Sequence, residues 1–232
     1  MRLPSGSKIL DRLLNGGYEK DTITTIYGPA GSGKTNLCIL CAINTVRAGK
    51  KVVYIDTENN FSVERAKQIA FDHKKILDEI IFLKPASFEE QKKAFRKLND
   101  LKSDNIGLII VDTIATLYRL EFSNCDNVYE INRELGKQLS YLAELTKKSN
   151  IPIIVTNQVY ANFENKEKVN IVGGDILKYT SKCLIELQIT PNRNRRCILI
   201  KHRSIEEQKE FIFKIVDGGI IGTKEGKGFR LF

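Results

Sequence analysis

Short apolar runs recur between residues 20 and 160, and they lack the polar–apolar alternation that marks a half-exposed strand. Continuous apolar runs rich in β-branched residues are typical of strands that are buried on both faces of a parallel sheet. The runs predict strands at Ile23–Tyr27, Val52–Ile55, Ile80–Leu83, Leu108–Val111 and Ile151–Val155.

Stretches with a helical period separate these runs. Apolar residues recur every three or four positions over Asn36–Arg47, Phe88–Leu101 and Val128–Lys148, which predicts helices with one apolar stripe. Lys147 and Lys148 suit the C-terminal end of the last helix, because cations there complement the helix dipole. Alternating strands and helices predict an α/β fold, with a mostly parallel central sheet and helices on both of its faces.

The pattern changes after Gln158. Segment Ala161–Gly174 is polar and ends in two glycines, so we interpret it as a mobile loop. Three further strands follow, and we expect them to form an antiparallel group at one edge of the parallel sheet: Lys182–Thr190, Arg196–Lys201 and Glu210–Val216. No linker rich in Gly, Ser or Pro interrupts the chain, and 232 residues suit a single domain spanning 1–232.

The formal net charge is +9, and residues 160–232 alone carry +5 of it. Such a balance favours acidic partners such as nucleic acid, although a lysine-rich solvated surface explains it equally well. No apolar run approaches the roughly 20 residues that cross a bilayer, so we expect a cytoplasmic protein that does not enter membranes. Cys38 and Cys41 lie in a predicted helix without a nearby histidine, and we interpret them as core residues rather than metal ligands.

One motif carries specific chemistry. A glycine-rich octapeptide of the form G-x-x-x-x-G-K-[ST] stands between a predicted strand and a predicted helix. Its residues are Gly28, Pro29, Ala30, Gly31, Ser32, Gly33, Lys34 and Thr35. Glycines let backbone N–H groups wrap a phosphate, and the helix N-terminus adds a positive dipole. Lys34 would then reach the β- and γ-phosphates of a nucleotide, and Thr35 would bind Mg²⁺.

Three further polar residues stand at the C-terminal ends of predicted parallel strands, where α/β proteins bind ligands. Asp112 follows a buried run and would hold Mg²⁺. Glu58 could orient or deprotonate an attacking water, or it could be a helix-capping or solvated carboxylate. Gln158 could sense the γ-phosphate, or it could be a loop amide with local partners.

Basic residues concentrate at a predicted hairpin in the C-terminal region. Arg193, Arg195 and Arg196 lie at its tip, and Lys201 and Arg203 follow closely. Arginine and lysine at this density can neutralise DNA phosphates, whereas a solvated hairpin is the simpler alternative. We therefore predict these residues as candidate DNA contacts.

Several segments together resemble the core ATPase domain of the recombinase family, which includes bacterial RecA, archaeal RadA and the eukaryotic strand-exchange proteins. The resemblance rests on segments 4–17, 28–35, 55–65, 117–119, 156–159 and 173–174. It implies a RecA-like phosphate-loop ATPase core, with ATP and Mg²⁺ as ligands.

The resemblance also implies roles for single residues. Glu58 corresponds to the water-activating glutamate, and Gln158 to the amide that links the γ-phosphate to the second DNA-binding loop. Arg65 matches an arginine that lies against adenine, although a surface position on a helix would explain it too. The two DNA-binding loops fall at Glu121–Tyr129 and at Tyr160–Gly173, and the second contains Lys166 and Lys168.

The chain also departs from the strand-exchange members. It starts close to the core domain, without their N-terminal helical DNA-binding domain, and Lys201–Ser204 replaces a proline-rich segment. In this it resembles small archaeal recombinase paralogues. That resemblance implies an accessory role in recombination and repair, weak ATP hydrolysis, no strand exchange, and binding to single-stranded or branched DNA.

The same resemblance implies work beside a RadA-type recombinase and a Holliday-junction nuclease, and it allows a homodimer. Two other functions stay open on the sequence. One is a regulatory protein–protein binding module that is switched by ATP. The other is a different RecA-like ATPase, such as a relative of the circadian-clock kinases, which share the phosphate loop and the opening segment.

Overall fold

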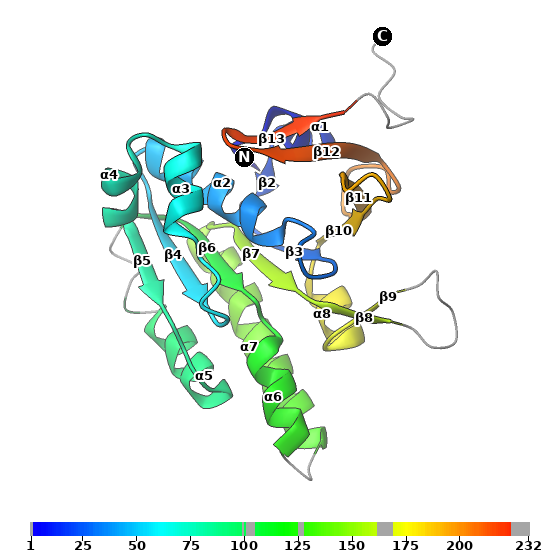
Figure 1. Ribbon diagram of the computed structural model, residues 1–232. Helices are drawn as coiled ribbons and strands as arrows, with labels where there is room; N and C mark the ends of the chain where they lie inside the picture. The colour runs from blue at the N-terminus through cyan, green and yellow to red at the C-terminus, as the bar shows by residue number, and fades with distance from the viewer. Residues whose placement is uncertain (1, 99, 101–104, 125–127, 162–168, 224–232) are drawn as a thin grey trace.

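The computed structural model describes residues 2–98, 100, 105–124, 128–161 and 169–223, together with the side chains of these residues except at 123–124, 128, 160–161 and 169–171. A nine-stranded sheet runs through the molecule in the order β13-β12-β11-β10-β3-β7-β6-β4-β5 (Figure 1). The strands span β3 Ile23–Tyr27, β4 Lys51–Asp56, β5 Ile80–Leu83, β6 Ile106–Asp112, β7 Ile153–Asn157, β10 Cys183–Ile189, β11 Arg195–His202, β12 Glu210–Val216 and β13 Gly219–Gly222. Two small sheets pair β1 (Arg2–Leu3) with β2 (Tyr18–Glu19) and β8 (Val159–Ala161) with β9 (Val169–Ile171).

The predicted α/β fold is confirmed. Strands β3 to β7 of the large sheet occupy the predicted apolar runs and pair in parallel. Strands β11 and β12 pair antiparallel at one edge, as predicted, and β13, which was not predicted, extends them. One assignment within that group was wrong: β10 pairs in parallel with β3 and antiparallel with β11, so it joins the two halves of the sheet.

A second correction concerns Ala161–Gly174. The segment was predicted as a loop, but Val169–Ile171 forms β9, whose partner is β8, and α8 begins at Gly174. The residues between the two strands lie outside the described part of the chain. The β-branched residues at 169 and 171 favour a strand, which the polar composition of the whole segment concealed.

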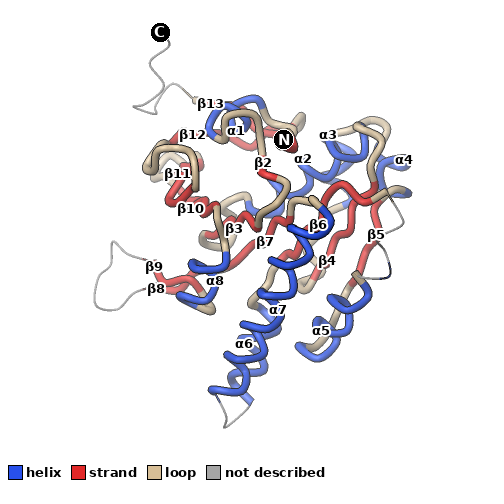
Figure 2. Tube along the Cα trace, turned by 180° about the vertical axis from the view of Figure 1, so that it is seen from behind, coloured by secondary structure: helices blue, strands red, loops and turns tan. Residues whose placement is uncertain are grey.

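Helices cover both faces of the sheet (Figure 2). One face carries α2 (Lys34–Arg47) with α1 (Lys8–Leu13), α3 (Val63–Ile69) and α4 (His73–Asp78), and these pack in one apolar cluster. The other face carries α5 (Phe88–Lys97), α6 (Thr116–Asn124), α7 (Val128–Ser149) and α8 (Gly174–Thr180), which pack in a second cluster. The central strands therefore have apolar partners on both sides, as their continuous apolar runs require.

Helix α2 is buried around most of its circumference, although one apolar stripe was predicted. Its outer side is covered by both ends of the chain. A Cβ on Gly6 would lie 2.6 Å from the carbonyl oxygen of Leu40, and one on Gly219 would lie 3.0 Å from the Leu40 side chain. Asn44 also donates to the Pro4 carbonyl at 3.0 Å. This close packing explains why Cys38 and Cys41 are fully buried core residues, as predicted.

Among the described residues, no helix combines the length and the apolar character that a membrane span needs.

Candidate nucleotide site

The phosphate loop connects β3 to α2, as predicted. Gly31 and Gly33 have φ of 73° and 104°, a region that favours glycine. Gly28 faces the neighbouring strand so closely that a Cβ there would lie 2.2 Å from the Leu187 carbonyl oxygen. The loop is thus held against β10, and its glycines are required by backbone geometry and by close approach.

Lys34 points back into this loop. Its Nζ donates to the carbonyl oxygens of Gly28 at 2.8 Å and Pro29 at 2.9 Å. Burial lowers the pKa of the Lys34 ammonium, while the nearby carboxylates of Asp112 and Glu58 oppose that shift. A cation held in this position by two carbonyl oxygens can be drawn to an anion that enters the loop.

Asp112 ends β6 and is 2% exposed. Thr35 and Tyr54 each donate a hydroxyl hydrogen bond to its Oδ2 at 2.8 Å, and Thr156 donates to its Oδ1. Burial raises the pKa of Asp112, and these three hydrogen bonds offset part of that shift. The predicted pair Thr35 and Asp112 therefore meets directly, with the oxygen ligands that Mg²⁺ prefers.

Glu58 follows β4 and lies across the cavity from the loop. Gln158 donates to its Oε1 at 2.8 Å, and Thr116 donates to the same oxygen. Asn60 donates to its Oε2 at 2.7 Å. Glu58 and Gln158, which the sequence places at the ends of separate strands, are therefore in direct contact. Gln158 directly precedes β8.

These groups line one cavity of about 380 Å³, within the size range of small-ligand sites. Residues from the loop, from the ends of β4, β6 and β7, and from the antiparallel strands surround it. The lining residues are Ala30, Gly31, Gly33, Lys34, Thr35, Asn36, Glu58, Asn60, Asp112, Thr113, Gln158, Arg195 and Ile215. A glycine loop, a buried lysine and a hydroxyl–carboxylate pair fit a magnesium-bound polyphosphate.

Arg65 does not line this cavity but touches Asn36, which does. Its guanidinium donates to the carbonyl oxygens of Val216 at 2.7 Å and Gly219 at 3.0 Å. Arg65 therefore fastens α3 to the turn between β12 and β13. Its predicted contact with adenine stays a prediction.

The basic residues predicted in the C-terminal region have different surroundings and partners. Arg193 is exposed in the turn before β11, where its φ is 57°. Arg196 lies 3.7 Å from Glu210, and Lys201 donates to the carbonyls of Lys178 and Ser181 at the end of α8. Arg203 binds both oxygens of Asp21, at 2.7 and 2.8 Å. Their DNA contacts stay predictions, and Lys166 and Lys168 lie outside the described residues.

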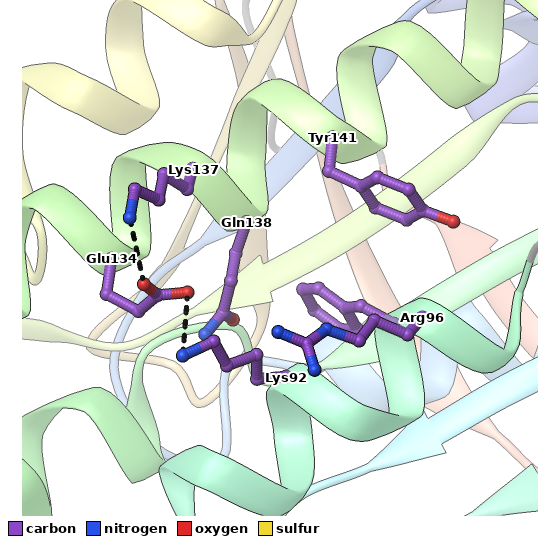
Figure 3. A pocket seen from close by; sticks show the side chains of 7 residues that line it. Lys92, Arg96, Glu134, Lys137, Gln138 and Tyr141 are labelled. Atoms are coloured by element: carbon purple, nitrogen blue, oxygen red, sulfur yellow. Dashed lines mark ion pairs between the residues drawn. The ribbon is translucent and has the colours of Figure 1, made fainter.

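A second cavity, of about 320 Å³, lies between α5 and α7 (Figure 3). Glu134 projects between Lys92 and Lys137, and its carboxylate oxygens lie 3.5 and 3.6 Å from the Nζ atoms of these lysines. Gln138 forms part of the cavity wall. The lining of this cavity has neither a glycine loop nor a hydroxyl–carboxylate pair, so it fits a polyphosphate less well than the first cavity does.

Sequence reasoning missed residues that hold the two carboxylates of this cavity in place, and it missed one residue that lines the cavity. Tyr54, Thr116 and Thr156 bind the two carboxylates, but each looks like an ordinary strand or helix residue in the sequence. Arg195 was grouped with the predicted DNA contacts, yet it lines the nucleotide cavity. The alternation along its strand indicates only the face on which Arg195 lies, because Cys197 and Leu199 have the same parity and face the core.

This topology, with the loop after the central strand β3 and carboxylates at neighbouring strand ends, defines a phosphate-loop nucleotide-binding protein with a RecA-like fold. The Rad51 family profile matches residues 1–223, and the chain belongs to the Rad51 family, whose members are nucleotide-binding ATPases. That match covers nearly the whole described chain.

Individual relatives agree with the family. The DNA repair and recombination protein RadB of Methanobrevibacter smithii is 42% identical over 227 residues, covering 95% of each chain. RadB of Methanococcus maripaludis strain C5 is 46% identical over 216 residues, covering 91% of this chain and 96% of its own. The crystal structure of the RadB recombinase superposes with a TM-score of 0.79 at 35% identity, covering 94% of this chain and 98% of that one.

Proposed function

We propose that this protein is an ATP- and DNA-binding accessory factor of homologous recombination and DNA repair, that it hydrolyses ATP slowly and that it performs no strand exchange itself. The cavity at the phosphate loop is the observation that carries the proposal, because it unites Lys34, Thr35, Asp112 and Glu58. The similarity to proteins named RadB supports the recombination and repair context.

The residues divide the chemistry among them. Lys34 and the loop N–H groups would hold the phosphates of ATP, while Thr35 and Asp112 would hold Mg²⁺, which neutralises phosphate charge when bound. Glu58 would orient the attacking water and accept its proton. Gln158 restrains Glu58 through their 2.8 Å hydrogen bond, so a change at Gln158 would reach the carboxylate directly.

DNA binding rests on the family and on the charge balance. Arg193, one of the predicted set, is exposed in a turn. We extend the proposal to a single domain over residues 1–232 in the cytoplasm, and to a RadA-type recombinase, a Holliday-junction nuclease and a second copy of the chain as partners.

The first experiment measures nucleotide binding. We expect Lys34→Ala to weaken Mg²⁺–ATP binding by about tenfold to a hundredfold, because charge-assisted hydrogen bonds to phosphate are lost. Arg47→Ala is the matched control, since Arg47 lies in the last turn of the same helix and pairs with Asp72. Titration of a fluorescent ATP analogue gives both affinities, and equal affinity for Lys34→Ala and wild type would refute the site.

The second experiment separates hydrolysis from binding. We expect Glu58→Gln to keep ATP affinity within about twofold and to lower single-turnover hydrolysis by about 10²- to 10⁴-fold, the usual contribution of a positioned base. Radiolabelled ATP measures the slow turnover, with and without single-stranded DNA. Normal turnover in Glu58→Gln would exclude its role, and strong stimulation by DNA would contradict an accessory function.

A second candidate function is an ATP-switched protein-binding module, favoured by the direct link from Glu58 through Gln158 to β8. Charge reversal distinguishes the two. If DNA binding matters, Arg193→Glu weakens it and flattens its salt dependence by about 0.9 per lost duplex contact, whereas Lys214→Glu, at an exposed position of β12, serves as the control. DNA affinity that is negligible in the wild type would favour the protein-binding module.

A further inference from the structure

Strand pairing brings the start of β11 to the phosphate loop. Strand β3 ends at Tyr27, which lies opposite Glu186 of β10. Beyond that pair β10 continues to Ile189, whose antiparallel partner is Arg195. The part of β10 that overhangs β3 runs beside the loop, as the close approach of Leu187 to Gly28 shows. Arg195 therefore lies level with the loop that follows β3.

Alternation along β11 then selects the face. Cys197 and Leu199 belong to the apolar cluster of α2, and Arg195 has the same parity. Arg196 points to the opposite face and lies 3.7 Å from Glu210. Two adjacent arginines thus face different surroundings: Arg195 lines the nucleotide cavity, and Arg196 does not.

The hydrogen bonds of Arg195 leave capacity for a ligand. Its Nη2 donates to the Gly31 carbonyl in the phosphate loop at 3.3 Å, beyond the usual range of a strong bond. Its Nε is buried and has no hydrogen-bond partner in the part of the chain that the structure describes. Its Nη1 donates to the Arg193 carbonyl at 2.7 Å, which anchors the side chain in place. No carboxylate forms an ion pair with it among the described residues.

We propose that Arg195 is a phosphate-binding residue of the nucleotide site, supplied by the antiparallel strands of the same chain, and not a DNA contact. The inference rests on the proposed ATP binding. A phosphate oxygen is a stronger acceptor for a guanidinium than the Gly31 carbonyl is, and it would replace that long bond. Arg195 lies opposite Phe213 in the antiparallel pairing of β11 with β12. A contact between Arg195 and phosphate would therefore also tie nucleotide binding to the antiparallel edge of the sheet.

The test compares Arg195→Ala with Arg196→Ala, neighbours of equal charge on opposite faces. Fluorescent ATP and ADP analogues are titrated in Mg²⁺ buffer, and DNA affinity is measured at several salt concentrations. We expect Arg195→Ala to lose about tenfold in ATP affinity while Arg196→Ala stays within about twofold of wild type. The salt slope of DNA binding should be unchanged in Arg195→Ala, since no DNA phosphate contact is lost.

Arg195→Lys keeps the charge without the planar fork, so we expect an intermediate ATP affinity. A larger loss for ATP than for ADP assigns the contact to the terminal phosphate, and equal losses assign it to the shared phosphates. Unchanged nucleotide affinity in a folded Arg195→Ala, or a lowered DNA salt slope, would overturn the inference. Wild-type protein that fails to bind ATP would instead refute the proposed function, so the two failures are distinguishable.

Discussion

The two ends of strand β11 carry arginines in opposite situations. At its start, Arg195 faces the nucleotide cavity with a long hydrogen bond to Gly31 and a buried Nε without a hydrogen-bond partner within the described part of the chain. Just after its end, Arg203 binds Asp21 through two nitrogens and Glu19 through its Nε at 2.7 Å. The two positions are about 25 Å apart along the strand.

This difference separates residues that act on a ligand from residues that hold the fold. Arg203 ties the antiparallel part of the sheet to the segment between β2 and β3, so its charge is already neutralised within the chain. Arg195 still offers charge and donors to an incoming group. Composition alone treats the two arginines as equal, and only their partners distinguish them.

Of the substitutions considered, we expect Gly28→Ala to have the largest effect at the nucleotide cavity. A Cβ would lie 2.2 Å from the Leu187 carbonyl oxygen, so β10 must move away from the loop. We expect a loss of stability of about 3 kcal/mol, together with weaker ATP binding. Urea unfolding measures the loss, and Gly136→Ala is the control, because a Cβ at Gly136 meets nothing within 4 Å. Equal stability of the two variants would contradict this packing argument.

Asp112→Asn, also at the nucleotide cavity, should affect the stability of the fold and the binding of ATP in opposite directions. Burial raises the pKa of Asp112, so the ionised carboxylate destabilises the ligand-free fold at neutral pH. We therefore expect Asp112→Asn to unfold a few degrees higher than wild type at pH 7 without nucleotide, and to lose Mg²⁺-dependent ATP binding.

The difference in unfolding temperature between Asp112→Asn and wild type should change with pH in a definite direction. A carboxyl group with a raised pKa in the folded state stabilises the fold at low pH and loses that contribution as pH rises through the folded value. The advantage of Asp112→Asn should therefore shrink as pH falls from 7 towards 4. Thermal unfolding at several pH values measures it, and an advantage that grows on acidification would contradict the assignment.

We expect the smallest effect from substitution of Arg203, just after the other end of β11, and we expect it to change only the stability of the fold. We expect Arg203→Ala to cost about 1 kcal/mol, because the pair with Asp21 is half-exposed and screened by solvent. The hydrogen bond from Arg203 lowers the pKa of Asp21, so this contribution is present above the unfolded pKa near 4 and is lost as pH falls further. The ATP affinity of Arg203→Ala should stay within about twofold of wild type. A larger loss would contradict the difference in role between Arg203 and Arg195.

Local patterns predicted the parts of the site that lie in one segment or at strand ends. The phosphate loop, Asp112 and Glu58 follow from a short motif and from buried strands whose ends meet. The position of Arg195 depends on the register between β10 and β11 and on the overhang of β10, which no local pattern contains. The pairing of Arg203 with Asp21 joins residues 182 positions apart, so spacing could not reveal it. Strand β9 was missed because it holds only two apolar residues, Val169 and Ile171, within a polar segment.

The covering of α2 by both ends of the chain has a consequence for how the protein is made. Leu40 is contacted from Gly6, which is synthesised before it, and from Gly219, which is synthesised nearly 180 residues later. The central strand β3 likewise lies between β7 and β10, so its two neighbours leave the ribosome long after it does. The nascent chain therefore carries an exposed apolar helix and an unpaired strand through most of synthesis, which are the features that chaperones recognise. The gap beside β3 closes once β10 has emerged, whereas the gap over α2 closes only with β13.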